Sequence, residues 1–104
     1  MALEVTNSNI TEVLAQNEIT VLQFSAEWCG PCRILGPIIE ELAAGNEGIS
    51  IGKVNVDENG ELGLTYSVRG IPTIIFFKNG EVVEKIVGVK SKAELQAKID
   101  SLKA

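Results

Sequence analysis

Residues 19–32 read ITVLQFSAEWCGPC, and a helical pattern follows them directly. Residues 19–24 are mostly apolar and β-branched or aromatic, with Gln23 as the clear exception, which is typical of a strand covered on both faces. From residue 31 to residue 44, apolar side chains recur at helical spacing, and Gly45 stands where a C-cap is expected. The apolar residues of this pattern are Ile34, Leu35, Ile38, Ile39 and Leu42. The sequence therefore predicts a buried strand and a helix, with C-x-x-C at their junction.

A further strand and a β-hairpin are expected downstream. Residues 49–56 alternate apolar with small or polar side chains, as a strand does. Residues 73–78 and 81–87 flank Asn79-Gly80, a dipeptide typical of type I′ turns because both central positions need a positive φ. We expect these two strands to be antiparallel.

Three more helices complete the pattern. Ser91 and Glu94 form a capping box ahead of a terminal helix. Residues 8–16 carry apolar side chains at helical spacing, whereas the pattern at 58–66 is interrupted by two glycines. The expected order is strand, helix, strand, helix, strand, helix, hairpin, helix. This alternation predicts an α/β layer structure with a mixed central sheet.

Length and composition restrict the class of protein. The 104 residues fit one domain, 1–104, and 45% of them are apolar. The net charge of -5 has no compensating basic cluster, which argues against nucleic acid and anionic membranes as partners. The longest apolar stretch, 71–77, is too short to span a bilayer, and no signal peptide pattern is visible. We therefore expect a cytoplasmic protein.

The two cysteines have the spacing that dithiol chemistry requires. Cys29 falls at the start of the predicted helix, where unpaired N–H groups and the helix dipole favour negative charge, so we expect it to be the attacking thiolate. Cys32 follows at i+3, about 5 to 6 Å away on a helix, within disulfide range. Pro31 is tolerated in the first helical turn, and Gly30 leaves room for the backbone of a partner.

Two other interpretations of the pair remain open. A zinc site usually has four nitrogen or sulfur ligands, and this chain has two Cys and no His, so a closed site would need two chains. A structural disulfide closing so small a loop would add little stability, and reducing compartments rarely keep one. We therefore expect no metal and favour a redox-active pair.

Five segments along the chain share one resemblance. They are AEWCGPCR at 26–33, KVNVD at 53–57, VRGIPT at 68–73, FKNG at 77–80 and VG at 87–88. In order and spacing they resemble the thioredoxin family over almost the whole chain. The resemblance implies a thioredoxin-like fold, with a central mixed five-stranded sheet flanked by about four helices. It implies a protein disulfide reductase that takes part in electron transport and cell redox homeostasis.

The resemblance also implies roles for particular residues. Cys29 would form the mixed disulfide, and Cys32 would resolve it. A separate flavoprotein, thioredoxin reductase, would restore the dithiol, so no cofactor is expected to be bound. We also expect the chain to be a monomer. The Ile71-Pro72 bond would be cis, with the Ile71 backbone pairing with an extended substrate. The remaining substrate-binding and supporting positions are Trp28, Gly30, Pro31, Val87, Gly88 and Val89.

Gln23 departs from the family pattern. The family usually has a buried Asp at this position, proposed as the acid/base for the resolving thiol, and an amide cannot accept a proton. A water held by Gln23, or Lys53, could serve instead, and a purely space-filling Gln23 is also possible.

Two other functions stay open: a disulfide oxidant or isomerase, and a redox-inactive binding module that uses the same surface.

Overall fold

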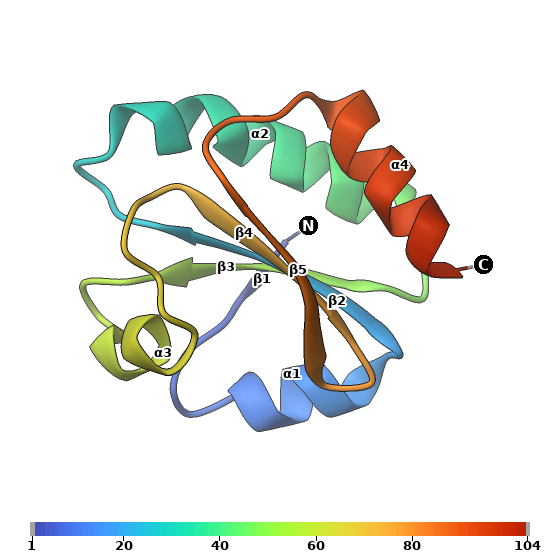
Figure 1. Cartoon of the computed structure of the whole chain (residues 1–104), viewed down its shortest axis with the longest axis horizontal. Helices are drawn as coiled ribbons and strands as arrows, with labels where there is room; N and C mark the ends of the chain where they lie inside the picture. The colour runs from blue at the N-terminus through green and yellow to red at the C-terminus, as the bar shows by residue number, and fades with distance from the viewer. Residues whose placement is uncertain (1, 104) are drawn as a thin grey trace.

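The structure is a computed structural model that describes residues 2–103, and its nine elements form three layers (Figure 1). Their order is the one expected from the sequence. The elements are β1 (Leu3–Glu4), α1 (Ile10–Gln16), β2 (Ile19–Ser25), α2 (Gly30–Gly45), β3 (Ser50–Asn55), α3 (Gly60–Thr65), β4 (Thr73–Lys78), β5 (Glu81–Val87) and α4 (Lys92–Lys103).

The five strands form one mixed sheet in the order β1-β3-β2-β4-β5. β2 lies at its centre, parallel to β3 and antiparallel to β4. In this register Gln23 is opposite Lys53 on β3 and Ile74 on β4. Because a central strand has neighbours on both sides and helices on both faces, all its residues from Ile19 to Phe24 are buried.

The helices cover the sheet in pairs, α2 and α4 on one face and α1 and α3 on the other (Figure 1). Successive side chains of β2 point to opposite faces. Val21 therefore packs between the sheet and helices α2 and α4, whereas Leu22 and Phe24 belong to the core between the sheet and helices α1 and α3. By the same alternation Gln23 points to the α2 face, next to the helix that carries the cysteines.

Two local predictions are confirmed in detail. The β4–β5 hairpin turns at Asn79 and Gly80, which have φ of 53° and 82° as a type I′ turn requires. At the start of α4, the Glu94 backbone N–H donates to Ser91 Oγ at 3.1 Å, and the Ser91 N–H donates to Glu94 Oε1 at 3.3 Å. This reciprocal pair is the capping box.

Some boundaries differ from the predictions. α2 continues through Gly45, and Asn46 is its C-cap. The reason is that Asn46 Nδ2 donates to the Leu42 carbonyl at 2.8 Å, so the helix end is satisfied by a side chain instead of a glycine turn. α1 begins at Ile10 instead of residue 8, because Asn9 Oδ1 accepts from the Thr6 N–H in a turn that precedes the helix. Among residues 2–103, no helix combines the length and apolarity needed to cross a membrane.

Candidate active site

Cys29 and Cys32 are joined by a disulfide at the N-terminus of α2, with their Cα atoms 5.3 Å apart. Cys29 is the N-cap residue, and the backbone N–H of Cys32 donates to its Sγ at 3.2 Å. The sulfur of Cys29 thus occupies the place where an N-cap oxygen usually accepts from the first turn. Negative charge on this sulfur is favoured by that N–H group and by the helix dipole.

The loop between β2 and α2 holds the cysteines in place. The Cys29 N–H donates to the Ala26 carbonyl at 3.1 Å, and Arg33 Nη2 donates to the Glu27 carbonyl at 3.1 Å. Pro31 lies in the first turn of α2, where its missing N–H needs no helical partner. The turn is therefore fixed from both sides of the disulfide.

The outer rim of the disulfide is apolar and open to solvent. Trp28 is 70% exposed, and Gly30 and Pro31 beside it are exposed as well. The indole Nε1 of Trp28 donates to Asp57 Oδ2 at 2.8 Å, which fixes the ring against the loop that follows β3. Asp57 had no predicted role in the site. The feature of the sequence that could have pointed to Asp57 is its position just after β3, because β2 and β3 are parallel and end at the same edge of the sheet.

The segment before β4 reaches the same edge. Thr73 at the start of β4 is opposite Phe24 near the end of β2, and opposite Val87 at the end of β5. The Ile71-Pro72 bond is cis, as the family resemblance implied.

The end of β5 is tied to this segment. The Gly88 N–H donates to the Pro72 carbonyl at 2.9 Å, and Gly88 has a φ of 101°, which favours glycine. Val87 and Val89 on either side are exposed, and Ile71 is half-buried. Residues expected to bind substrate are therefore brought to the same end of the sheet as the cysteines.

A cavity of about 350 Å³ connects this segment with the tryptophan. It extends from Trp28 to Ile71 and includes Val68 and Arg69. Its walls are mainly apolar, and it opens beside the disulfide rim. An apolar side chain of a bound polypeptide fits such a recess.

The inner side of the disulfide is buried and polar. Gln23 is 1% exposed, and its Nε2 donates to the Cys32 carbonyl at 3.5 Å, whereas its Oε1 has no hydrogen-bond partner among residues 2–103. A cavity of about 450 Å³ is lined by Gln23, Cys32, Gly36 and Lys53, among others. Lys53, expected from the sequence as one group that could act in place of the missing carboxylate, lines this cavity, and its Nζ is paired with Glu40 Oε2 at 2.9 Å.

A backbone hydrogen bond and the ion pair together lower the pKa of Glu40. The backbone N–H of Ala2 donates to Glu40 at 2.8 Å, and this bond, followed by the one from Lys53, holds the pKa of the Glu40 carboxyl below its usual value of 4.5. Glu40 is therefore an anion at neutral pH.

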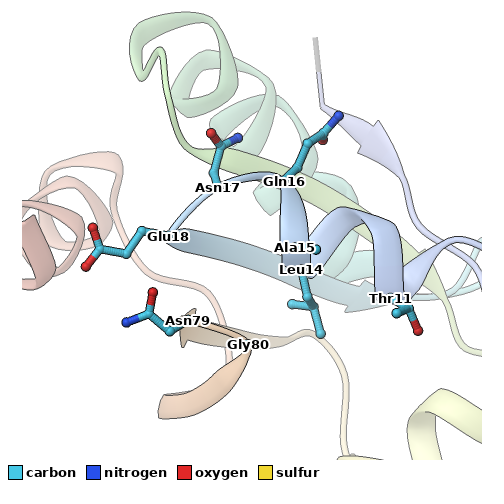
Figure 2. Close-up of a pocket in the computed structure, with 8 residues that line it drawn as sticks. All are labelled: Thr11, Leu14, Ala15, Gln16, Asn17, Glu18, Asn79 and Gly80. Atoms are coloured by element: carbon cyan, nitrogen blue, oxygen red, sulfur yellow. The ribbon is translucent and has the colours of Figure 1, made fainter.

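Another cavity, of about 530 Å³, lies at the other end of the sheet (Figure 2). It is bounded by the end of α1, the start of β2 and the β4–β5 turn. Of the residues labelled in Figure 2, only Glu18 is charged, and it is paired with Lys78 at 3.8 Å. This cavity holds no cysteine and is separate from the disulfide.

The fold and the position of the disulfide agree with comparisons to known proteins. The family model described as Thioredoxin matches residues 1–101. The chain belongs to the thioredoxin family. A thioredoxin of Chlamydia pneumoniae is 46% identical over 88 residues, which cover 85% of each chain. A thioredoxin of Chlorobaculum thiosulfatiphilum is 44% identical over 99 residues, covering 93% of this chain and 92% of the relative.

Solved thioredoxins have the same fold. A mutant thioredoxin from Halobacterium salinarum NRC-1 superposes with a TM-score of 0.94 at 36% identity, covering 99% of this chain and 91% of that one. The thioredoxin of Malassezia sympodialis superposes with a TM-score of 0.87 at 31% identity, covering 100% of this chain and 92% of that one. The thioredoxin-like fold expected from the sequence is thus confirmed. As a member of this family, the chain is a disulfide reductase that acts by dithiol/disulfide exchange, and Cys29–Cys32 is its C-x-x-C pair.

Proposed function

We propose that Cys29 is the attacking thiolate and Cys32 the resolving thiol of a cytoplasmic protein disulfide reductase. One observation carries the assignment. Cys29 Sγ is the N-cap acceptor of α2, bonded by the Cys32 N–H, so a helix N-terminus stabilises the thiolate of Cys29. Cys32 lies three residues further along the helix, and its carbonyl, not its sulfur, accepts from the neutral amide of Gln23.

The reaction then follows in two exchanges. The Cys29 thiolate attacks one sulfur of the substrate disulfide, and the other substrate sulfur leaves as a thiolate. Cys32 then loses its proton and attacks Cys29 Sγ, which releases the second substrate sulfur and forms the Cys29–Cys32 disulfide. The Cα separation of 5.3 Å lets this disulfide close on an intact helix.

The exposed rim is the proposed docking surface for protein substrates. Trp28 is exposed next to Cys29, and Val87 and Val89 are exposed apolar side chains at the same end of the sheet, an arrangement that suits a polypeptide partner. The backbone of Ile71, with Pro72 behind it, is available to pair with an extended segment of that partner. Gly30 and Gly88 leave space for the partner's main chain.

Regeneration requires two electrons from outside the chain. We assign this step to a flavoprotein thioredoxin reductase, with no cofactor bound to the thioredoxin itself. In this proposal residues 1–104 act as one domain and as a monomer, without nucleic acid or membrane, and contribute to electron transport and cell redox homeostasis.

Trapping experiments test the assignment of the two thiols. Cys32→Ser should accumulate mixed disulfides with a protein substrate, because attack proceeds and resolution does not, whereas Cys29→Ser should form none. The opposite pattern would exchange the two roles. A strongly oxidising reduction potential would favour an oxidant or isomerase, and a wild-type protein that fails to reduce protein disulfides would favour a binding module.

A further inference from the structure

The carboxamide of Gln23 is held at one end only. Its Nε2 donates toward the Cys32 carbonyl, and its Oε1 is the one buried side-chain nitrogen or oxygen in residues 2–103 without a hydrogen-bond partner. Exchanging the two amide atoms would bring Oε1 against the Cys32 carbonyl, which is unfavourable, so the observed orientation is the better one. An acceptor buried without a donor destabilises the state in which it occurs.

The charged neighbours of this acceptor are engaged elsewhere. Lys53 Nζ is paired with Glu40, and Arg33 donates to the Glu27 carbonyl, although both residues line the cavity beside Gln23. Cys32 lines the same cavity. In the disulfide state its sulfur carries no proton and has nothing to donate.

Reduction of the disulfide adds a hydrogen-bond donor to this cavity, because Cys32, unlike Cys29, lines it. Two glutathione thiols can supply the two electrons and two protons: the Cys29–Cys32 bond breaks, each sulfur gains an electron and a proton equivalent, and the glutathione sulfurs form their own disulfide. Cys32 becomes a buried thiol, which is a hydrogen-bond donor. A donor thus appears on a residue that lines the same cavity as an acceptor that lacked one.

We propose that Gln23 is a redox-linked positioning residue, whose Oε1 accepts the hydrogen bond of the Cys32 thiol in the reduced protein and so favours the dithiol over the disulfide. This inference rests on the proposed function, in which Cys32 is the protonated, resolving thiol. It differs from acid/base catalysis, because a neutral amide receives a hydrogen bond without taking the proton.

The exchange equilibrium with glutathione tests the proposal. Gln23→Met keeps the approximate volume of the side chain and removes the acceptor. The equilibrium constant for reduction should fall about tenfold, which corresponds to a potential about 30 mV more negative. An unchanged constant, or one that favours the dithiol more strongly, would overturn the proposal. Loss of the Nε2 bond affects both redox states, so it cancels in this measurement.

Asn46→Leu is the matched control. Asn46 is also a buried carboxamide on the α2 side, but its Nδ2 donates to the Leu42 carbonyl and its Oδ1 accepts from Gln96 Nε2 at 2.9 Å. This variant should lower stability and leave the glutathione equilibrium unchanged. A similar shift in both variants would show that the potential responds to general destabilisation, which contradicts a specific role for Gln23.

Unfolding of both redox forms gives an independent test. Gln23→Met removes the unpartnered acceptor from the oxidised form, so its denaturation midpoint should rise relative to that of the reduced form, and Gln23→Leu should do the same. Equal changes in the two forms would refute the proposal. If the wild-type protein fails to reduce protein disulfides, the proposed function fails; if it reduces them and Gln23→Met has the wild-type glutathione equilibrium, only this inference fails.

Discussion

The two cysteines are three residues apart and nearly equally buried, at 3% and 5%, yet they lie between contrasting surroundings. On the outer side, Trp28 and its neighbours form an exposed apolar rim anchored by Asp57. On the inner side, Gln23 is buried in the central strand, and its Oε1 has no hydrogen-bond partner in the part of the chain that the structure describes. One side of the disulfide is suited to contact with another protein, and the other places a polar group of the protein interior beside a thiol.

Because the two sides differ, substrate binding should depend on the outer side, and stability and proton transfer should depend on the inner side. Changes on the rim should alter the encounter with a protein substrate and leave the stability of the fold intact, because exposed side chains contribute little to the core. Changes at Gln23 should alter stability and proton transfer, because a buried polar atom has few alternative partners. The following variants test that separation.

Gln23→Asp should have the largest effect on stability. A carboxylate at this position loses its hydration, and Lys53 is already paired with Glu40, so the free energy of unfolding should fall by about 3 kcal/mol at pH 7. Denaturant unfolding at pH 7 and pH 4 measures this effect. Burial raises the pKa of the new carboxyl in the folded state, so the destabilisation develops as pH rises above the unfolded value and is small near pH 4.

Gln23→Asn is the control for that variant, because it shortens the side chain equally and adds no charge. Its loss of stability should not depend on pH. If the Gln23→Asp protein is as stable as the wild type at pH 7, the inner side of the disulfide tolerates a charge. The contrast between the two sides of the disulfide would then be lost.

The same Asp should accelerate resolution of the mixed disulfide. A carboxylate beside Cys32 can accept the thiol proton, which Gln23 cannot, so the single-turnover release of substrate should become about a hundredfold faster. Stopped-flow measurement of release from a preformed mixed disulfide checks this. Unchanged release would show that another group near Cys32 already accepts the proton.

Trp28→Ala should weaken recognition on the outer side. Loss of the exposed indole should lower kcat/KM for a protein disulfide about tenfold, while reduction of a small disulfide and the denaturation midpoint change little. Val83→Ala, at an exposed valine on β5 that is not part of the rim, should leave both substrates unaffected. Equal losses with the small and the protein disulfide would assign Trp28 to the chemistry instead of docking.

Glu40→Gln should have the smallest effect. The pair with Lys53 is more than one-third exposed on both sides, so solvent screens it and the loss should stay below about 1 kcal/mol. Because the Glu40 pKa is lowered in the folded state, its contribution is present above pH 4.5 and disappears as the pH falls through the lowered value. Unfolding midpoints of variant and wild type should therefore converge in acid. A difference that persists at low pH would exclude this ion pair as its source.

Much of the fold follows from local patterns. Periodicity located the central strand and α2, and the Asn79-Gly80 turn and the Ser91 capping box have the geometry that those residues predict. The weak glycine-interrupted pattern at 58–66 also forms a short helix, α3, because Leu62 is buried in the core below the sheet. Tertiary packing supplied what the local propensity lacked.

The C-x-x-C spacing and its place before a helical pattern were sufficient to identify the cysteines as a redox pair. The spacing defines the distance between Cys29 and Cys32, and the helical pattern places Cys29 at the positive end of a helix dipole. The Trp28–Asp57 bond, the pairing of Lys53 with Glu40, and the contact of Pro72 with Gly88 depend on which strands lie side by side, so no local pattern contains them. The sequence by itself determined the disulfide and the kind of fold. Only the tertiary structure decided that one oxygen of Gln23 is buried without a donor beside Cys32, because hydrogen-bond satisfaction depends on every neighbour in space.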